Sequence, residues 1–211
     1  MRRLIEGVHR FQAGELGRYR ELFGRLAREG QQPHTLFITC SDSRVLAELI
    51  TQSQPGDLFV VKNPGNIVPP ASVTGSTNST AASIEFAVEV LGVSDIVVCG
   101  HSQCGAIKAL MGDLPPNTEL PHLERWLNLM APVRERVRNR CAPATSQTDQ
   151  RRAAEQENVL FALENLRSYP AVRRRLGEGS LRLHGWFFEI ATGELFAYDS
   201  LGGLVPLRQP V

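Results

Sequence analysis

The alternation of short apolar runs with helical segments in the first half of the chain constrains the fold more than any other feature. Residues 35–39, 57–62 and 94–99 are rich in β-branched and aromatic side chains and predict strands, and helical patterns at 45–51 and 81–91 separate them. Because strands joined through helices pair in parallel, this pattern predicts an α/β fold with a central, mostly parallel β-sheet flanked by helices.

Helical periodicity dominates the N-terminus. Apolar residues recur at every third or fourth position over residues 14–29, and residues 2–11 predict a shorter helix before them. Gly30 and Pro33 end the pattern. We therefore expect an N-terminal helical arm over residues 1–30, and its apolar stripe needs a surface to pack against.

The second half of the chain has a different pattern. Residues 119–140 and 150–169 predict helices, and residues 181–190 and 194–198 predict two strands joined by a turn. These segments predict a C-terminal extension of helices and strands. The 211 residues hold no internal repeat and no linker, so we expect one domain over residues 1–211.

Composition excludes several classes of protein. A net charge of +1 provides no basic surface for nucleic acid, and four cysteines are too few for a disulfide scaffold but suit reduced thiols or metal ligands. The first residues lack the apolar core of a signal peptide, and no run approaches the roughly 18 apolar residues of a membrane span. We expect a cytoplasmic protein without a nucleic-acid or membrane partner.

Chemically distinctive residues follow two of the predicted strands. The first strand ends in Cys-Ser-Asp-Ser-Arg at residues 40–44, and the third ends in Gly-His-Ser-Gln-Cys-Gly at residues 100–105. Open α/β sheets bind ligands at the carboxyl ends of their strands, so the two motifs meet there. Cys40, His101 and Cys104 then form a set of two thiolates and one imidazole, which suits zinc with one open coordination position.

Each of these residues also has an ordinary interpretation. A buried cysteine packs like a small apolar residue, a histidine beside glycine is often a loop residue, and Asp42 with Arg44 can form a simple salt bridge. A redox pair of Cys104 with Cys40 or Cys99 is a further alternative, although the chain contains no C-x-x-C motif. The combination at two adjacent strand ends favours a functional site.

The two motifs together resemble the signature of the β-class carbonic anhydrases, in particular the plant-like and cyanobacterial branch. The likeness extends over nearly the whole chain and includes residues 38–39, 55–59, 63–70, 82–87, 157–159 and 184–186. It implies the reversible hydration of carbon dioxide to bicarbonate and a proton, with one zinc ion per chain held by Cys40, His101 and Cys104.

The resemblance also assigns Asp42 and Arg44 to a catalytic dyad. Arg44 would hold Asp42 in a bidentate pair, keep it from the open zinc position, and offset the charge of the two thiolates. Asp42 would then accept a hydrogen bond from the attacking nucleophile. Some members of the family close the site with this carboxylate in a pH-dependent manner, and they have Trp where this chain has Phe37. We therefore predict the open, permanently active type.

The remaining family positions concern the substrate pocket and the assembly. The resemblance places Gln31, Phe59, Pro64, Phe86 and Gly105 around the substrate, with the glutamine often contributed across a dimer interface. It also implies a homodimer or a higher homo-oligomer, formed through the sheets and N-terminal helices.

Two other functions are compatible with the same motifs. Carbon disulfide and carbonyl sulfide hydrolases resemble this family in their zinc ligands, and a non-catalytic protein could use zinc as a structural staple. Structural zinc sites usually have four protein ligands, which disfavours the second alternative. A zinc deaminase is disfavoured because its H-x-E and P-C-x-x-C signature is absent.

Overall fold

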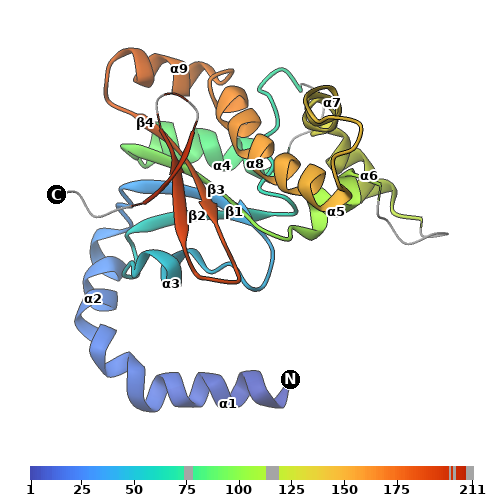
Figure 1. Cartoon of the computed structure of the whole chain (residues 1–211). Coiled ribbons are helices and arrows are strands. Elements are labelled where there is room, and N and C mark those ends of the chain that lie inside the picture. The colour runs from blue at the N-terminus through green and yellow to red at the C-terminus, as the bar shows by residue number, and fades with distance from the viewer. Residues whose placement is uncertain (74–77, 113–118, 200, 202, 208–211) are drawn as a thin grey trace.

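The computed structural model describes residues 1–73, 78–112, 119–199, 201 and 203–207, and a six-stranded sheet forms its centre (Figure 1). The strands lie in the order β2-β1-β3-β4-β5-β6. Their bounds are β1 Thr35–Cys40, β2 Leu58–Asn63, β3 Asp95–His101, β4 Arg182–Phe188, β5 Leu195–Tyr198 and β6 Leu204–Pro206. Strands β2, β1, β3 and β4 are parallel, whereas β5 and β6 run antiparallel to their neighbours. The sheet is therefore mostly parallel, as the sequence predicts.

The strand order reverses between β1 and β3. From β1 the chain continues to β2 on one side of it, and β3 then pairs on the other side. The register sets Cys40 opposite Asn63 and Thr39 opposite Cys99, so the carboxyl ends of the three strands lie level. Such a reversal leaves a crevice at the carboxyl ends of the strands, which is where open α/β sheets bind their ligands.

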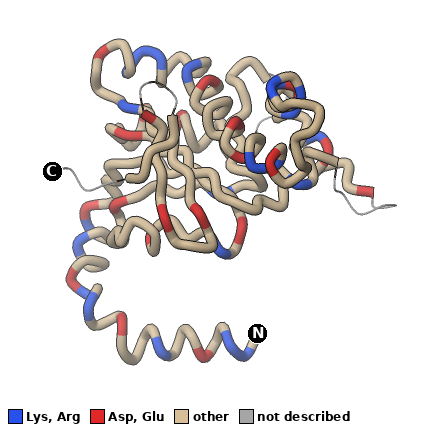
Figure 2. The backbone as a smooth tube through the Cα atoms, in the orientation of Figure 1, with Lys and Arg blue, Asp and Glu red and all other residues tan. Residues whose placement is uncertain are grey.

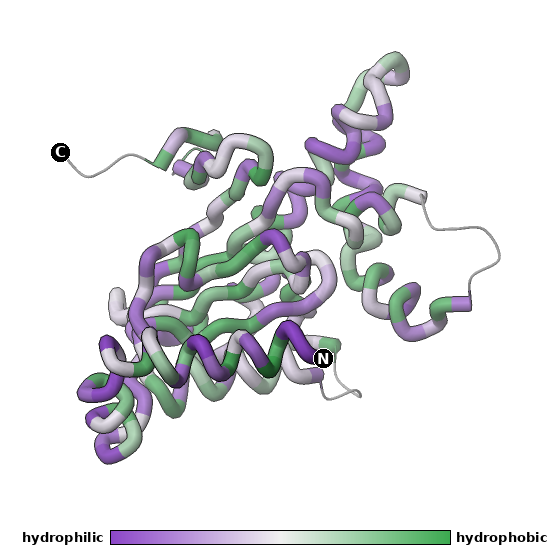
Figure 3. The backbone as a smooth tube through the Cα atoms, turned by 90° about the horizontal axis from the view of Figure 1, so that it is seen from below, coloured by the Kyte–Doolittle hydropathy of each residue, from purple (hydrophilic) through white to green (hydrophobic). Residues whose placement is uncertain are grey.

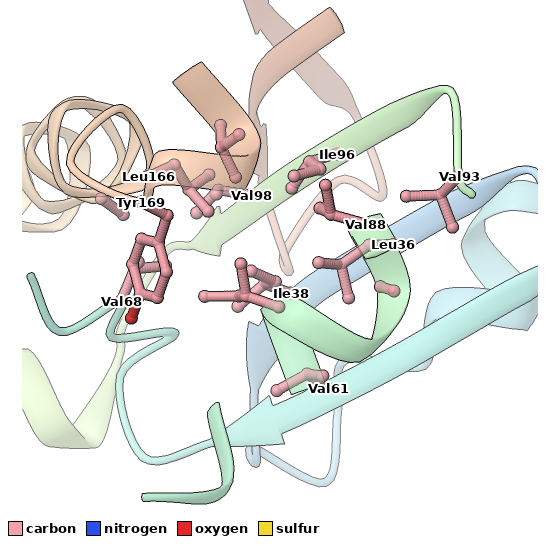
Figure 4. Packing of buried hydrophobic residues seen from close by; sticks show 14 of the residues in the cluster. Leu36, Ile38, Val61, Val68, Val88, Val93, Ile96, Val98, Leu166 and Tyr169 are labelled. Carbon is pink, nitrogen blue, oxygen red and sulfur yellow. The ribbon is translucent and has the colours of Figure 1, made fainter. Parts of the chain in front are cut away.

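Helices cover the sheet unevenly. Their bounds are α1 Arg2–Arg10, α2 Leu16–Glu29, α3 Ala47–Thr51, α4 Ser79–Glu85, α5 Gly105–Leu110, α6 Pro121–Asn128, α7 Ala131–Arg140, α8 Gln147–Leu166 and α9 Pro170–Gly177. Helices α4, α8 and α9 pack on one face of the sheet around a core centred on Leu36, Ile38, Ile96 and Val98 (Figure 4). The opposite face carries a smaller apolar cluster with Phe37, and the helix nearest to it is the short α3 (Figure 1).

The N-terminal arm extends away from the sheet. A π-helical segment, η1 Phe11–Glu15, joins α1 to α2, and neither helix has a buried residue. Leu4, Ile5 and Val8 expose between half and three quarters of their surface. Figure 3 shows apolar and polar residues alternating along α1, and Figure 2 shows charges of both signs on the arm. The predicted arm is present, and no residue of α1 or α2 is fully buried by the described part of the chain, although Leu26 of α2 lies against Gly56.

Three proline-initiated helices account for most differences from the sequence-based expectations. The stretch predicted as one helix at 119–140 is divided into α6 and α7, and α9 follows α8 as a separate element. Each of α6, α7 and α9 has proline in its first turn, where the missing N–H costs little. The helix predicted at 81–91 is α4 followed by a π-helical segment, η2 Phe86–Val90. Strand β6 was not predicted.

Glycine allows α8 to approach the middle of the sheet. A Cβ atom added to Gly100 would lie 2.6 Å from Cγ2 of Val159 on α8. We expect Gly100→Ala to lower the free energy of unfolding by about 1–3 kcal/mol through this overpacking. Urea denaturation measures the effect. The matched control is Gly17→Ala on the exposed face of α2, where nothing lies within 4 Å, and it should raise stability by up to about 1 kcal/mol. An unchanged unfolding midpoint for Gly100→Ala would contradict the packing described.

Candidate metal centre

Two thiols and an imidazole converge at the carboxyl ends of β1 and β3. Cys40 and His101 are the last residues of these strands, and Cys104 immediately precedes α5. The two sulfur atoms lie 3.9 Å apart, and one donor atom from each of the three residues lies within 4.8 Å of the others. All three side chains are buried. The structure therefore brings together the three ligands that the sequence predicts, from segments 61 or more residues apart.

The orientation of His101 leaves one ring nitrogen available as a ligand. Its Nδ1 lies 2.9 Å from the backbone carbonyl of Ser102, so this nitrogen carries the proton. Its Nε2 is buried and has no hydrogen-bond partner among the described residues. Metal-ligating histidines usually donate their second N–H in this way, which fixes the tautomer and the direction of the ring. The unpaired Nε2 fits a metal ion.

Cys40 and Cys104 would repel each other if both were ionised to thiolates, because their sulfur atoms lie 3.9 Å apart. Backbone N–H groups of Asp42 and Gly65 donate to the Cys40 sulfur at 3.4 Å each. The hydrogen bond from Cys104 lowers the pKa of Cys40, and these N–H groups lower it further. The same hydrogen bond and burial raise the pKa of Cys104. A divalent cation that prefers sulfur and nitrogen removes this conflict because it balances both negative charges, and zinc is such a cation.

A carboxylate and a guanidinium border the cluster. Nε and Nη2 of Arg44 donate to the two carboxylate oxygens of Asp42 at 2.9 and 2.8 Å, and the backbone N–H of Arg44 adds a third bond at 2.9 Å. Arg44 therefore holds the pKa of Asp42 well below its usual range. Oδ2 of Asp42 lies 4.0 Å from Nε2 of His101. The carboxylate that Arg44 orients and keeps ionised therefore lies beside the cluster.

Comparison with known proteins places this geometry in a family. The model of the carbonic anhydrase family matches residues 35–195, which contain all five of these residues. The chain belongs to the β-carbonic anhydrase family. It is 43% identical to a carbonic anhydrase of Synechocystis over 95% of this chain and 72% of the relative, and 43% identical to one of Pseudomonas aeruginosa over 94% and 88%. The reaction of the family is the hydration of carbon dioxide, and the chain is an enzyme of this class.

Solved β-carbonic anhydrases share the fold over almost the whole chain. The structure of the β-carbonic anhydrase CcaA superposes with a TM-score of 0.91 at 42% identity and covers 98% of this chain and 99% of that one. Tetrameric β-carbonic anhydrases from the ascomycete Sordaria macrospora give a TM-score of 0.81 at 31% identity, covering 97% and 98%. The sheet order and the helical arm are therefore features of the family fold.

The predicted substrate-pocket residues of this β-carbonic anhydrase fall into two groups. Pro64 and Gly105 are chain neighbours of Gly65 and Cys104 and so border the cluster. Phe59 pairs with Leu36, at the other end of β1 from Cys40 and about 13 Å away along the strand.

Phe86 lies with Phe59 rather than with the cluster, since their ring centroids are 5.8 Å apart, and it is exposed. Gln31 is exposed at the end of the arm. Within one chain, the structure does not bring Gln31, Phe59 and Phe86 to the metal centre.

Helix α8 supports the cluster with polar residues that the sequence-based site prediction did not include. Glu155 accepts the backbone N–H of Cys104 at 2.9 Å, and Asn158 donates to the carbonyl of Gly65 at 2.8 Å. Further along, Asn165 donates to the carbonyl of Val68. The signal that could have revealed them is the recurrence of polar residues three and seven positions apart on a helix whose other residues at that spacing are apolar.

The other two cysteines lie apart from the site. Cys99 points to the opposite face of the sheet, where it packs with Phe37 and Val97. Burial raises the pKa of Cys99 to about 12. Cys141 is half-buried after α7. Both residues are free thiols. Because Cys99 and Cys104 belong to different clusters on the two faces of the sheet, a redox pair of these two residues has no support in the geometry.

Proposed function

We propose that Cys40, His101 and Cys104 hold one zinc ion per chain and that this centre hydrates carbon dioxide. The observation that carries the proposal is the buried, unpaired Nε2 of His101 within ligand distance of two thiols. Zinc with three protein ligands and an open position supplies a nucleophile at neutral pH because it lowers the pKa of water. Orientation of the reacting groups falls to Asp42 and Arg44 beside the cluster.

Asp42 and Arg44 orient the reacting groups in this proposal. The bidentate pair fixes both oxygens of Asp42, so the carboxylate accepts a hydrogen bond from the nucleophile and does not itself reach the open ligand position. Arg44 also donates to the carbonyl of Gln103 at 3.2 Å, which ties the dyad to the loop that carries Cys104. This engaged pair supports the open, permanently active type of site.

The alternative substrates are disfavoured by the comparisons. A carbon disulfide hydrolase resembles the chain at 20% identity with a TM-score of 0.52, which reflects a shared fold alone. Relatives that are 41–43% identical over more than nine tenths of the chain are carbonic anhydrases. A structural zinc staple is disfavoured because the cluster among the described residues has three donors, one fewer than such sites use.

A stopped-flow assay with both substrates tests the assignment. We expect rapid hydration of carbon dioxide and no detectable release of sulfide from carbon disulfide by the same zinc-loaded sample. Sulfide release without carbon dioxide hydration would establish the alternative enzyme, and inactivity toward both would favour the structural role.

The active form in this proposal contains at least two copies. The exposed apolar stripe of α1 and the thinly covered sheet face support pairing through the arm and the sheet. Gln31, at the end of the arm, would then lie beside the partner's metal centre. We expect sedimentation to give a mass of twice the 23.3 kDa chain or a multiple of it, and a monomer that hydrates carbon dioxide at the full rate would contradict this.

We also propose a cytoplasmic location. None of the described helices is long and apolar enough to span a membrane. Positions of both charge signs are interspersed along the chain, which fits a protein without a membrane or nucleic-acid partner (Figure 2).

A further inference from the structure

Two buried polar residues on α8 face the loops that carry the thiol ligands. Glu155 and Asn158 lie one turn apart, and their exposed fractions are 6% and 1%. Polar side chains are rarely buried this deeply unless they satisfy specific partners. Glu155 bonds the backbone of Cys104 itself, and Asn158 bonds the backbone of Gly65, which in turn donates to the Cys40 sulfur.

Glu155 fixes the backbone at Cys104. Its Oε1 accepts the N–H of Cys104 at 2.9 Å. Gln103 is the residue before Cys104 in this turn. Gln103 has a φ of 58°, in the left-handed region that costs a non-glycine residue on the order of 1 kcal/mol. The hydrogen bond from the Cys104 N–H to the Glu155 carboxylate stabilises this strained turn, and the turn places the Cys104 sulfur near His101.

Asn158 holds the residue whose N–H supports Cys40. Its Nδ2 donates to the carbonyl of Gly65 at 2.8 Å, and the N–H of Gly65 donates to the Cys40 sulfur. Gly65 has a φ of 82°, and an added Cβ would lie 3.1 Å from Ala106 and 3.3 Å from Met130. Gly65 is therefore bonded at both its N–H and its carbonyl and is closely surrounded, and the bond from Asn158 restrains it on the side of the following peptide.

The helix that carries both residues is itself held in place. Val159 lies against Gly100 and Gly185 in neighbouring strands β3 and β4, where added Cβ atoms would lie 2.6 and 3.1 Å from its methyl groups. This close contact leaves α8 no room to move nearer to β3 and β4 at this point. A rigid helix can therefore fix both ligand loops relative to the same strand.

We propose that Glu155 and Asn158 are positioning residues that together set the placement of the two thiolate ligands. The inference rests on the proposed zinc centre and adds the residues that give it its geometry. Outer partners of metal ligands typically contribute about 10- to 100-fold in metal affinity. We expect a loss of this size when either contact is removed.

The experiment compares four variants of the full chain. Glu155→Met and Asn158→Ala remove the two contacts, whereas Glu155→Gln keeps an oxygen that can accept the Cys104 N–H. The matched control is Asn165→Ala, because Asn165 makes the same kind of contact from the same helix, to the carbonyl of Val68 at 2.8 Å, but is farther from the thiols. Zinc affinity is measured by chelator competition, ligand geometry by the absorption bands of the cobalt-substituted protein, and stability by urea denaturation.

The expected pattern separates positioning from general stabilisation. Zinc affinity falls about 10- to 100-fold in Glu155→Met and Asn158→Ala and the cobalt bands move, whereas Glu155→Gln and Asn165→Ala stay within about threefold of the wild type with unmoved bands. If either of the first two variants does not fold, Glu155→Gln, Asn165→Ala and the remaining variant still make the comparison.

Two results contradict different claims. Wild-type zinc affinity and cobalt bands in both contact-removing variants, with stability lowered as in Asn165→Ala, would overturn the positioning role alone. Failure of the wild-type chain to bind zinc would overturn the proposed metal centre itself.

Discussion

Cys104→Ser is expected to release zinc and to lower kcat/KM for carbon dioxide hydration on the order of a thousandfold or more. A serine hydroxyl stays protonated at neutral pH and is a poor ligand for zinc, so the cluster keeps one thiolate and one imidazole. Zinc content by atomic absorption and hydration by stopped flow, measured on the same preparation, check this.

Cys99→Ser is the matched control for this variant. It makes the same change at a cysteine that is also fully buried but lies on the opposite face of the sheet. We expect it to lose stability and to keep one zinc ion per chain. Full zinc occupancy and normal turnover in Cys104→Ser would show that the chain does not use this thiol as a ligand.

Arg44→Ala is expected to keep zinc and to lower kcat/KM by about 10²- to 10⁴-fold. Without the guanidinium, Asp42 loses two side-chain hydrogen bonds and is free to turn toward the cluster, since its Oδ2 lies 4.0 Å from His101 Nε2. Arg44→Lys should recover little activity because an ammonium cannot form the two parallel bonds. Asp42→Asn should also retain zinc and lose most activity, because the neutral amide no longer offers two carboxylate oxygens to Arg44 and to the nucleophile.

The control for Arg44 is an arginine with the same pairing geometry at the other end of the sheet. Arg182 donates to the two oxygens of Asp95 at 2.9 Å each. We expect the zinc-loaded Arg182→Ala protein to hydrate carbon dioxide within about twofold of the wild-type rate, since surface ion pairs contribute about 1 kcal/mol or less. Near-normal turnover in Arg44→Ala would remove the dyad from the mechanism.

The metal centre could be predicted from the sequence because its residues adjoin strand ends. The apolar runs that end at Cys40 and near His101 indicate parallel strands, and parallel strands place their carboxyl ends together. Two local motifs therefore suffice to predict a contact between residues that are 61 positions apart in the sequence. The same holds for Asp42 and Arg44, which follow Cys40 within four positions.

Residues that act through tertiary contacts could not be found in this way. Glu155 and Asn158 are separated from their partners by 51 and 93 positions, and no local pattern links them to Cys104 or Gly65. The boundary between α8 and α9 depends on Pro170, and strand β6 is three residues long and pairs with β5, itself a short strand. Phe59 and Phe86 illustrate the reverse case. The resemblance assigns them to the substrate pocket, but the structure of one chain does not place them at the metal centre.

The most direct test of the account measures zinc content and hydration rate together as metal is removed and restored. The protein is dialysed against a chelator, zinc is returned in steps, and each step is assayed for bound zinc per chain and for the initial rate of carbon dioxide hydration. We predict that the rate rises in proportion to bound zinc and saturates at one ion per chain. Full hydration in the metal-free protein, or one bound zinc ion per chain without hydration, would contradict the central claim.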